Sequence, residues 1–270
     1  TAEDQGRTLQ KIFAQVRART GHDFSRYKRT TILRRLQRRM QLHQVETLDG
    51  YLELMRNDRD EVKKLFDDML ITVTEFFRDK EVFDHLQKHV IPQLFEGKTE
   101  QDRLRVWSVG CSTGEEAYSL AMLLVEEADR RDDAPTPQVF STDLHEPSLT
   151  RAREGVYPDS IASDVSAERL KRFFIKENGS YRVKQELREL IVFAPHNLLK
   201  DPPFSHLDLI VCRNLMIYLQ RDLQEDVAAL FHYALEPSGL LVLGTSETAT
   251  PSDLFASEDS GFGVYRRLGV

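Results

Sequence analysis

The sequence contains little cysteine and no long apolar run. Its only cysteines, Cys111 and Cys212, lie about a hundred residues apart, which argues against a disulfide scaffold and against a four-ligand zinc site. The longest apolar runs, such as 207–212 and 240–244, are far too short to cross a bilayer. No charged and then apolar leader opens the chain, so we expect a cytoplasmic protein without membrane insertion.

The remaining composition is typical of a globular protein. It has 40% hydrophobic and 30% charged residues, over a length sufficient for one α/β core and a smaller domain. The net charge of −7 is unevenly distributed, because residues 1–40 hold eleven lysines or arginines against three acidic residues. The excess of basic residues in 1–40 indicates that this segment meets an anionic partner, whether nucleic acid, a membrane surface or an acidic protein.

Helical periodicity with little glycine or proline dominates the first part of the chain. Thr47 and the pair Asn57-Asp58 supply candidate N-caps for two of these segments. The pattern predicts a small all-α domain, which covers residues 1–78 together with its linker. The expected helices lie near 8–19, 30–43, 47–57 and 59–70.

From about residue 80, short β-rich runs alternate with helical stretches, as in a doubly wound parallel sheet. We therefore predict a Rossmann-like α/β domain over residues 79–270. Its expected strands are 104–109, 138–142, 190–194, 207–212 and 240–243, and its expected helices are 115–130, 148–154 and 220–234.

A hairpin signal interrupts this rhythm. Asn178-Gly179 separates two short alternating runs, FFIKE and YRVKQ. Because an Asn-Gly turn between such runs is typical of a β-hairpin, we expect a small antiparallel β insert at about 165–188.

A small-residue turn after the first predicted strand points to a ligand site. Gly110 and Gly114 lie between the strand and the next helix, where glycines let a ligand approach the backbone and the helix offers free N–H groups. Glu115 and Glu116 in the first helical turn would repel a phosphate but suit a positive amino group. The pattern therefore favours S-adenosylmethionine over NAD or a P-loop nucleotide. A glutamate at a helix start is also favourable with the macrodipole alone.

Polar residues follow the other predicted strands too. Asp143 ends the second strand, where its carboxylate can accept both ribose hydroxyls of an adenosine, although it could instead be an N-cap of the following helix. Arg213, Asn214 and Tyr218 follow another strand and belong near the transferred group, and Asn197 could reach the adenine. Tyr218 could also be a tyrosine at the edge of the core.

Taken together, these residues resemble the CheR family of chemoreceptor glutamate methyltransferases, and the resemblance covers nearly the whole chain. Its most specific strings are TVTEFFR at 72–78, WSVGCSTGEEAYS at 107–119 and CRNLMIY at 212–218. The resemblance implies methylation of glutamate carboxylates on the cytoplasmic helical region of chemoreceptors, with S-adenosylmethionine as cofactor and S-adenosylhomocysteine as product. It also implies a Rossmann-like methyltransferase fold with an N-terminal all-α domain and a small antiparallel insert. The chain could be the methyltransferase part of a larger CheB/CheR fusion, which its strings also resemble.

The resemblance assigns roles to individual residues. Thr72, Thr74 and Arg78 would close over the cofactor, although the family commonly has asparagine at the position of Thr72. Glu116 would hold the amino group. The other cofactor-binding residues would be Gly110 in the turn, Asp143 at the ribose, Asn197 and Leu198 on the adenine side, and Arg213 with Asn214 in the rest of the pocket.

The expected chemistry needs alignment more than a general base. A glutamate carboxylate is already a nucleophile at neutral pH, and proximity could supply on the order of 7–11 kcal/mol at best. Arg78 and Tyr218 are the candidates for orienting that carboxylate beside the methyl group, and neither has to act as an acid or base.

A basic helix is the candidate substrate surface. On a helical wheel Arg34, Arg35, Arg38 and Arg39 span an arc of about 140°, opposite an apolar face. Methylated receptor regions in the family are long glutamate-rich helices, which such a face could hold. The alternative is a solvated face paired with the chain's own acidic residues.

Three further expectations concern partners. The short loop of the predicted insert, 177–180, indicates that methylation does not depend on a tether peptide at the receptor's C-terminus. A nucleic-acid methyltransferase is an alternative, because an arginine-rich helix also suits phosphates, but the string DPPF at 201–204 precedes a predicted strand instead of following one, so we expect no nucleic-acid partner. A module that senses S-adenosylmethionine without turnover is the second alternative.

Overall fold

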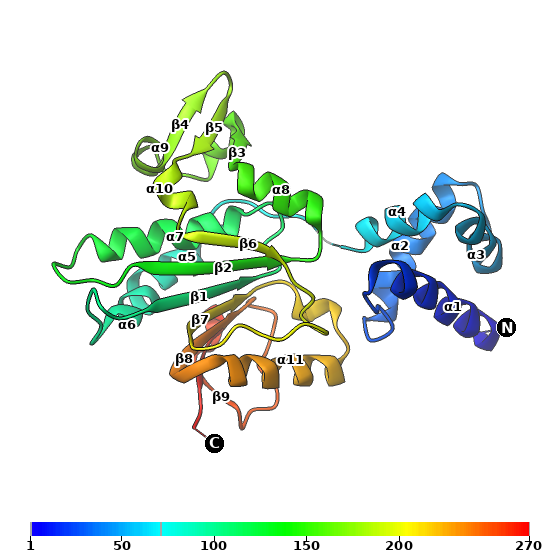
Figure 1. Cartoon of the computed structure of the whole chain (residues 1–270). Coiled ribbons are helices and arrows are strands. Elements are labelled where there is room, and N and C mark those ends of the chain that lie inside the picture. The colour runs from blue at the N-terminus through cyan, green and yellow to red at the C-terminus, as the bar shows by residue number, and fades with distance from the viewer. Residues whose placement is uncertain (1, 71, 270) are drawn as a thin grey trace. The chain divides into compact units, whose positions relative to one another are not determined.

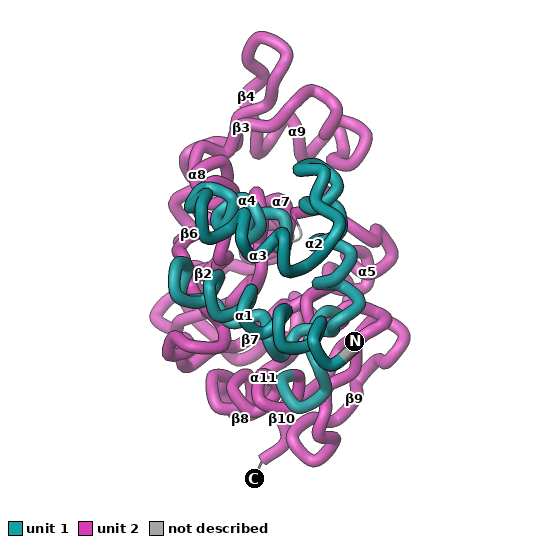
Figure 2. The backbone as a smooth tube through the Cα atoms, turned by 90° about the vertical axis from the view of Figure 1, so that its right-hand side faces the viewer, with its two compact units in different colours: residues 1–71, 218–223 teal, residues 72–217, 224–270 magenta. Residues whose placement is uncertain are grey.

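The structure is a computed structural model that describes residues 2–70 and 72–269, with side chains from residue 3. The chain divides into two compact units, coloured separately in Figure 2. The first unit contains residues 1–71 and 218–223, and the second contains 72–217 and 224–270.

The first unit is helical, as predicted. Thr47 caps α3 by accepting from the Gly50 N–H group, and Asp58 caps α4 by accepting from the N–H groups of Asp60 and Glu61. Apolar residues from all four helices form one core, with Ile12, Leu36, Tyr51 and Leu65 fully buried. The helices are α1 Ala2–Thr20, α2 Arg29–Leu42, α3 Leu48–Asn57 and α4 Arg59–Met69.

A segment from late in the chain completes this unit. Leu219 is buried and forms an isolated β-bridge with Tyr27. The Lys28 N–H group donates to the Tyr218 carbonyl at 2.8 Å, and the Gln220 N–H group donates to the Arg26 carbonyl at 2.9 Å. The periodicity of the sequence contained no sign of this pairing, because it joins residues nearly two hundred positions apart.

The second unit is built on a seven-stranded sheet in the order β6-β2-β1-β7-β8-β10-β9. The pairs from β6 to β8 are parallel, and β10 is antiparallel to both β8 and β9. The expected Rossmann-like fold is therefore present. The strands are β1 Leu104–Val109, β2 Pro137–Asp143, β6 Ile191–Pro195, β7 Leu207–Cys212, β8 Leu235–Leu243, β9 Phe255–Asp259 and β10 Val264–Arg267.

Helices cover both faces of this sheet. The side chains of β1 alternate between the two faces and contact helices on each. Leu104 and Val106 lie in the core that includes Leu120 of α7. Trp107 points the other way and packs edge-on against Phe231 of α11, with ring centroids 5.8 Å apart. Figure 1 shows α7 and α8 on one side of the sheet and α11 on the other. The helical segments are α5 Lys80–His85, a π-turn Leu86–Val90, α6 Ile91–Phe95, α7 Glu115–Ala128, α8 Glu146–Glu154, α11 Arg221–Ala234, and 3-10 turns at Met216–Tyr218 and Ser260–Phe262.

The β insert contains three antiparallel strands in the order β3-β5-β4. The Asn178-Gly179 turn joins β4 and β5, so the predicted hairpin is confirmed. The insert begins with β3 at Val156, earlier than the predicted start near residue 165, because a three-residue strand is too short to show an alternating pattern. Its elements are β3 Val156–Pro158, a 3-10 turn Asp159–Ser163, α9 Ala167–Phe173, β4 Phe174–Glu177, β5 Ser180–Val183 and α10 Gln185–Arg188.

The boundary between the two units lies earlier in the chain than expected. The predicted end of the first domain was residue 78, whereas residues from 72 onward cluster with the second unit, since Phe76 and Phe77 are buried in its core.

Within residues 2–70 and 72–269, no helix has both the length and the apolar character needed to cross a membrane.

Candidate functional site

The carboxyl ends of β1, β2 and β7 meet where the strand order reverses. From β1 the chain proceeds to β2 and β6 on one side and then crosses to β7 on the other. In open α/β sheets such a switch point forms the crevice where ligands bind. The sequence-predicted residues that follow these strands are therefore brought to one edge of the sheet.

Gly110 leaves one wall of this crevice open. It has φ +69°, and a Cβ atom added there would meet no atom within 4 Å. The N–H groups of Gly110 and Cys111 both donate to the Thr142 carbonyl, at 2.8 and 2.9 Å, and so fix the turn to the end of β2. A ligand can therefore approach the backbone at Gly110 closely.

Gly114 has a different task. It has φ +95°, and an added Cβ would lie 2.9 Å from the Ala152 Cβ and 3.1 Å from the Tyr157 hydroxyl. Glycine at this position lets the start of α7 pack against α8, and it does not line the open wall.

Glu116 faces the ends of β1 and β7. One carboxylate oxygen accepts from the Ser108 hydroxyl at 3.1 Å, and the other lies 3.6 Å from the Arg213 guanidinium. Glu115 instead accepts from the Thr113 hydroxyl at 2.6 Å. Burial raises the pKa of Glu116, and the charge of Arg213 only partly offsets this effect. Of the two glutamates, Glu116 is therefore the one available to a cationic group at the strand ends.

Asp143 is held by the backbone at the end of β2. Its carboxylate accepts from the N–H groups of Ser112 at 2.8 Å and His145 at 2.9 Å. The N-cap of α8 is His145, so the alternative that Asp143 caps this helix is wrong. Burial raises the pKa of Asp143, and the backbone hydrogen bonds oppose this rise. Each carboxylate oxygen keeps a lone pair for a further donor, such as a ribose hydroxyl.

Arg213 is a buried cation at the end of β7. Its side chain is 0% exposed, and it donates to the Arg78 carbonyl at 3.2 Å and pairs with the Asp79 carboxylate. Arg213 therefore joins residues 78–79 to the sheet and to Glu116. Its direct contact with a cofactor stays a prediction.

Residues 72–79 form a loop that is anchored at several points. Phe76 and Phe77 are buried, and the Phe77 N–H group donates to the Ser119 hydroxyl at 3.0 Å. The Ser112 hydroxyl donates to the Thr72 carbonyl at 3.2 Å, which brings Thr72 to the glycine turn. Arg78 is half-buried, and its guanidinium donates to the Val73 carbonyl at 3.1 Å. Thr74 is half-buried in the same loop.

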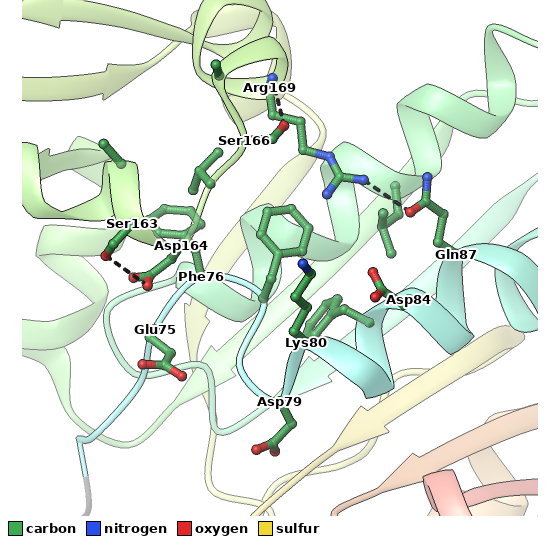
Figure 3. A pocket seen from close by; sticks show the side chains of 16 residues that line it. Glu75, Phe76, Asp79, Lys80, Asp84, Gln87, Ser163, Asp164, Ser166 and Arg169 are labelled. Carbon is green, nitrogen blue, oxygen red and sulfur yellow. Dashed lines mark hydrogen bonds between the residues drawn. The ribbon is translucent and has the colours of Figure 1, made fainter.

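A pocket of about 420 Å³ lies behind this loop, against α5 and the start of α9. Figure 3 shows Phe76 and Lys80 pointing toward it, with Arg169 hydrogen-bonded to Gln87 at its rim. Neither Glu116 nor any other strand-end residue of the crevice lines this pocket, whereas Asp79, which pairs with Arg213 at the crevice, does.

Asn197 and Leu198 follow β6 and are both half-buried. The side-chain oxygen of Asn197 accepts from the Leu199 N–H group at 3.0 Å, and its own N–H group donates to the Asp201 carboxylate at 2.7 Å. These bonds fix a turn at the carboxyl end of β6. Contacts of Asn197 and Leu198 with an adenine stay predictions.

Glu247 is a buried acid that the sequence reasoning missed. Its carboxylate accepts from the N–H groups of Asn214 and Ile217 at 3.0 and 3.1 Å, and Asn214 has φ +59°. The signal was present, because Glu247 follows the strand ending at Leu243 by a few residues. The same strand-end argument that selected Asp143 would have found it.

Tyr218 and the four arginines belong to the first unit. Tyr218 is half-buried, and its predicted catalytic role stays a prediction. Arg34 and Arg38 are exposed and Arg35 is half-buried.

Arg39 does not share this exposed face. Its side chain is only 11% exposed and pairs with the fully buried Glu61 at 2.6 Å. Burial opposes ionisation of Glu61, but hydrogen bonds from Arg39, Tyr51 and His43 outweigh it, so the pKa of Glu61 is lowered. The expectation that Arg39 contributes to the surface is therefore wrong, because a buried carboxylate binds it inside the unit.

The charges around the crevice favour a cationic ligand. Carboxylates of Glu116, Asp79, Asp143 and Glu247 outnumber the guanidinium groups of Arg78 and Arg213. An excess of partly buried negative charge is stabilised by a positive partner. Together with the open backbone at Gly110, this arrangement fits the amino group, sulfonium and ribose of S-adenosylmethionine.

Comparison with known proteins gives the same assignment. The family model for the S-adenosylmethionine-binding domain of CheR methyltransferases matches residues 72–260, and the model for the CheR all-alpha domain matches residues 7–70. The chemotaxis protein methyltransferase of Escherichia coli is 32% identical over 251 residues, which are 88% of this chain and 83% of that protein. Chemotaxis protein methyltransferase 1 of Pseudomonas aeruginosa is 33% identical over 227 residues and covers 82% of both chains.

A much longer relative is also similar. An uncharacterized 104.1 kDa protein of Rhodobacter capsulatus, encoded in the hypE 3' region, is 44% identical over 225 residues. These residues are 83% of this chain but only 24% of that protein. That the present chain is part of a CheB/CheR fusion stays a prediction. The two family matches cover most of the sequence, and the chain belongs to the CheR family of S-adenosylmethionine-dependent methyltransferases.

Proposed function

We propose that this protein methylates glutamate side chains on the cytoplasmic helical region of chemotaxis receptors and so forms glutamate methyl esters. Membership of the CheR family and the names of the relatives from Escherichia coli and Pseudomonas aeruginosa support this proposal. The names of these relatives specify chemotaxis protein methylation. Receptor glutamates as the methyl acceptor are part of the proposal.

The arginine face of α2, defined as Arg34, Arg35 and Arg38, is the observation that carries the choice of acceptor. Within the described part of the chain, these three side chains have no carboxylate partner, whereas neighbouring Arg39 pairs with Glu61 and Asp68. This contrast argues against a solvated face that is neutralised by the chain's own acids. Unpaired arginines on one helix face suit an acidic helix of a partner, because opposite charges steer encounter and fix register.

Cofactor binding would use the residues of the crevice. Glu116 would accept from the amino group, Asp143 would accept from the ribose hydroxyls, and the backbone at Gly110 would pack against the ligand. When bound, S-adenosylmethionine supplies an electrophilic methyl group on a sulfonium centre. The acceptor glutamate is ionised at neutral pH and needs no base.

Orientation of the acceptor is therefore the main task left to the protein. Arg78 is half-buried in the anchored loop 72–79, so its guanidinium can hold a carboxylate without being free to move widely. Too tight a pairing would reduce the nucleophilicity of the glutamate. We assign positioning to Arg78, with Tyr218 as its proposed partner in that role.

The β insert is relevant to whether methylation depends on a tether peptide of the receptor. The turn between β4 and β5 contains only Asn178 and Gly179, and this short connection supports methylation without a receptor tether peptide. Equal methylation rates for receptor fragments with and without their C-terminal tail would agree with this. A marked loss on removal of the tail would contradict it.

Mass spectrometry of a receptor cytoplasmic fragment after incubation with the protein and S-adenosylmethionine tests the acceptor. We expect mass additions of one methyl group on glutamates, and these should be lost on mild base treatment. The double variant R34A/R38A should methylate the receptor fragment far more slowly than wild type. R56A, which removes an exposed arginine of α3 paired with Glu53, should methylate it at the wild-type rate.

Two alternative functions give different outcomes. A nucleic-acid methyltransferase would transfer the methyl group to DNA or RNA and leave the receptor fragment unchanged, since an arginine face also suits phosphates. A module that only senses S-adenosylmethionine would bind it and methylate neither acceptor. Either result would overturn the proposal.

A further inference from the structure

Glu247 joins the carboxyl ends of two neighbouring strands. It lies in the turn after β8 and is 6% exposed. Strands β7 and β8 are parallel neighbours, with Cys212 paired to Leu243, so the turns that follow them lie side by side. Arg213 and Asn214, two predicted cofactor residues, are in the turn after β7.

The Glu247 carboxylate is bound by three backbone N–H groups. One oxygen accepts from Gly244 at 2.6 Å and from Asn214 at 3.0 Å, and the other accepts from Ile217 at 3.1 Å. A carboxylate is suited to this task, because it only accepts hydrogen bonds. A glutamine would turn its NH₂ group toward at least one of these donors.

The surrounding backbone leaves the carboxylate little freedom. A Cβ atom added to Gly244 would lie 2.8 Å from a Glu247 carboxylate oxygen and 3.1 Å from the Asn214 side-chain oxygen. Asn214 has φ +59°, in the left-handed region that asparagine adopts more readily than most residues other than glycine. The bonds to Glu247 hold the backbone in this conformation.

We propose that Glu247 is a positioning residue for methyl transfer. Its carboxylate fixes the backbone of residues 214–217, so that Arg213 and Asn214 keep their places at the cofactor crevice. This inference rests on the proposed function, because it assigns a role within the same site.

The contacts of Arg213 explain how a change at Glu247 reaches the reaction. Arg213 directly precedes one of the held N–H groups, and its guanidinium lies 3.6 Å from Glu116 and contacts the Arg78 carbonyl. A shift of the β7 turn would displace the Arg213 guanidinium relative to Glu116 and to the Arg78 carbonyl. The Gln224 side chain also donates to the Met216 carbonyl at 2.8 Å, so the loop is held from a second side.

The variant E247Q tests this assignment. At a temperature well below the Tm of every variant, we expect kcat for receptor methylation to fall roughly tenfold to a hundredfold, as for a small misplacement of reacting groups. The matched control is E127Q, because Glu127 is also a buried glutamate, but among the described residues its carboxylate accepts only from Arg130 and Arg131 at the far end of α7. E127Q should keep full kcat even where its Tm is lowered.

A purely structural role predicts a different result. The two variants would then lose Tm but have wild-type kcat per folded molecule, and this outcome would overturn the inference. If E247Q does not fold, G244A provides the second test, since its methyl group displaces the carboxylate and leaves its charge in place. Failure of both variants to fold would also assign Glu247 to folding alone.

Failure of the proposed function is separable from failure of this inference. If wild-type protein does not methylate the receptor fragment, the acceptor is wrong, and calorimetry with S-adenosylhomocysteine replaces kcat as the measurement. A weaker affinity in E247Q than in E127Q would still support the positioning role. Equal affinities would overturn it.

Discussion

Burial of the Glu116 and Asp143 carboxylates lowers the stability of the ligand-free protein and favours binding of a cationic ligand. Burial raises the pKa of both groups. Between its unfolded and its raised folded pKa, each group binds more protons in the folded state, so stability falls as the pH rises through that window. At a pH where these carboxylates are ionised they therefore destabilise the ligand-free protein, and a cationic ligand offsets this cost.

The variant E116Q should lose affinity for S-adenosylhomocysteine. A hydrogen bond to a charged group contributes about 1.5–3 kcal/mol, so we expect a roughly tenfold to hundredfold weaker Kd by calorimetry. The Ser108 hydroxyl can donate or accept, and it therefore tolerates glutamine. E115Q is the matched control and should bind as wild type, since Glu115 bonds to Thr113. Similar losses in both variants would contradict the assignment of Glu116.

The same affinity should depend on pH. Ligand binding favours the ionised carboxylates, so affinity should fall as the pH is lowered through the raised pKa values of Glu116 and Asp143. The stability of the ligand-free protein should change in the opposite direction over that window through these two groups. Calorimetry across a pH series measures the first effect, and E116Q should show a shallower dependence. A dependence in E116Q as steep as in wild type would exclude Glu116 as its source.

At the scale of elements, the loop 72–79 is an anchored part of the methyltransferase unit and no simple linker. Phe76 packs against the rings of Tyr157 and Phe174, with centroids 4.8 and 5.7 Å away. Both partners belong to the β insert. The insert therefore supports the loop that carries Thr72, Thr74 and Arg78.

Truncation of Phe76 should affect both stability and binding. F76A removes a ring that is 2% exposed and should cost about 3–5 kcal/mol of unfolding free energy, seen as a lower Tm. At temperatures where the variant is folded, its affinity for S-adenosylhomocysteine should also be weaker, because the loop is released. V73A is the control, since Val73 in the same loop is 74% exposed. Wild-type affinity in folded F76A would show that the loop does not need this anchor.

Elements with strong periodicity could be predicted from the sequence, and elements that depend on distant contacts could not. Helices α2 to α4 and strands β1, β2, β6 and β7 match the expected ranges closely, whereas α1 begins at Ala2, six residues before the expected start. The strands β9 and β10 were missed, because segments such as FASED and VYRR are short and largely polar. β10 exists as a strand because it pairs with β8, at Val264 to Val242 and its neighbours.

The candidate site shows the same division. Glu116 and Asp143 could be predicted, since a strand end and a glycine turn place them locally. The buried pairing of Arg39 with Glu61 could not, because a helical wheel puts Arg39 beside Arg35 and contains no information about α4. The Glu247 contacts join two separate turns, and only the register of β7 with β8 brings them together.

At the scale of the whole molecule, charge separates the proposed acceptor-binding part from the proposed cofactor-binding part. Residues 1–40 hold eleven basic residues against three acidic ones, while the whole chain has a net charge of −7. The arginine face lies in this basic part, and the carboxylates of the crevice lie in the acidic remainder. Salt should therefore affect acceptor binding and cofactor binding to different degrees.

Raising the ionic strength should reduce kcat/KM for a receptor fragment, mainly through KM, because exposed charges are screened beyond a Debye length of about 8 Å at 0.15 M salt. Affinity for S-adenosylhomocysteine should change much less, since Glu116 and Asp143 are largely buried. In R34A/R38A the slope of log kcat/KM against log salt should be shallower, and in R56A it should equal that of wild type. An unchanged slope in R34A/R38A would place the acceptor on another surface, and it would leave the proposed methylation chemistry intact.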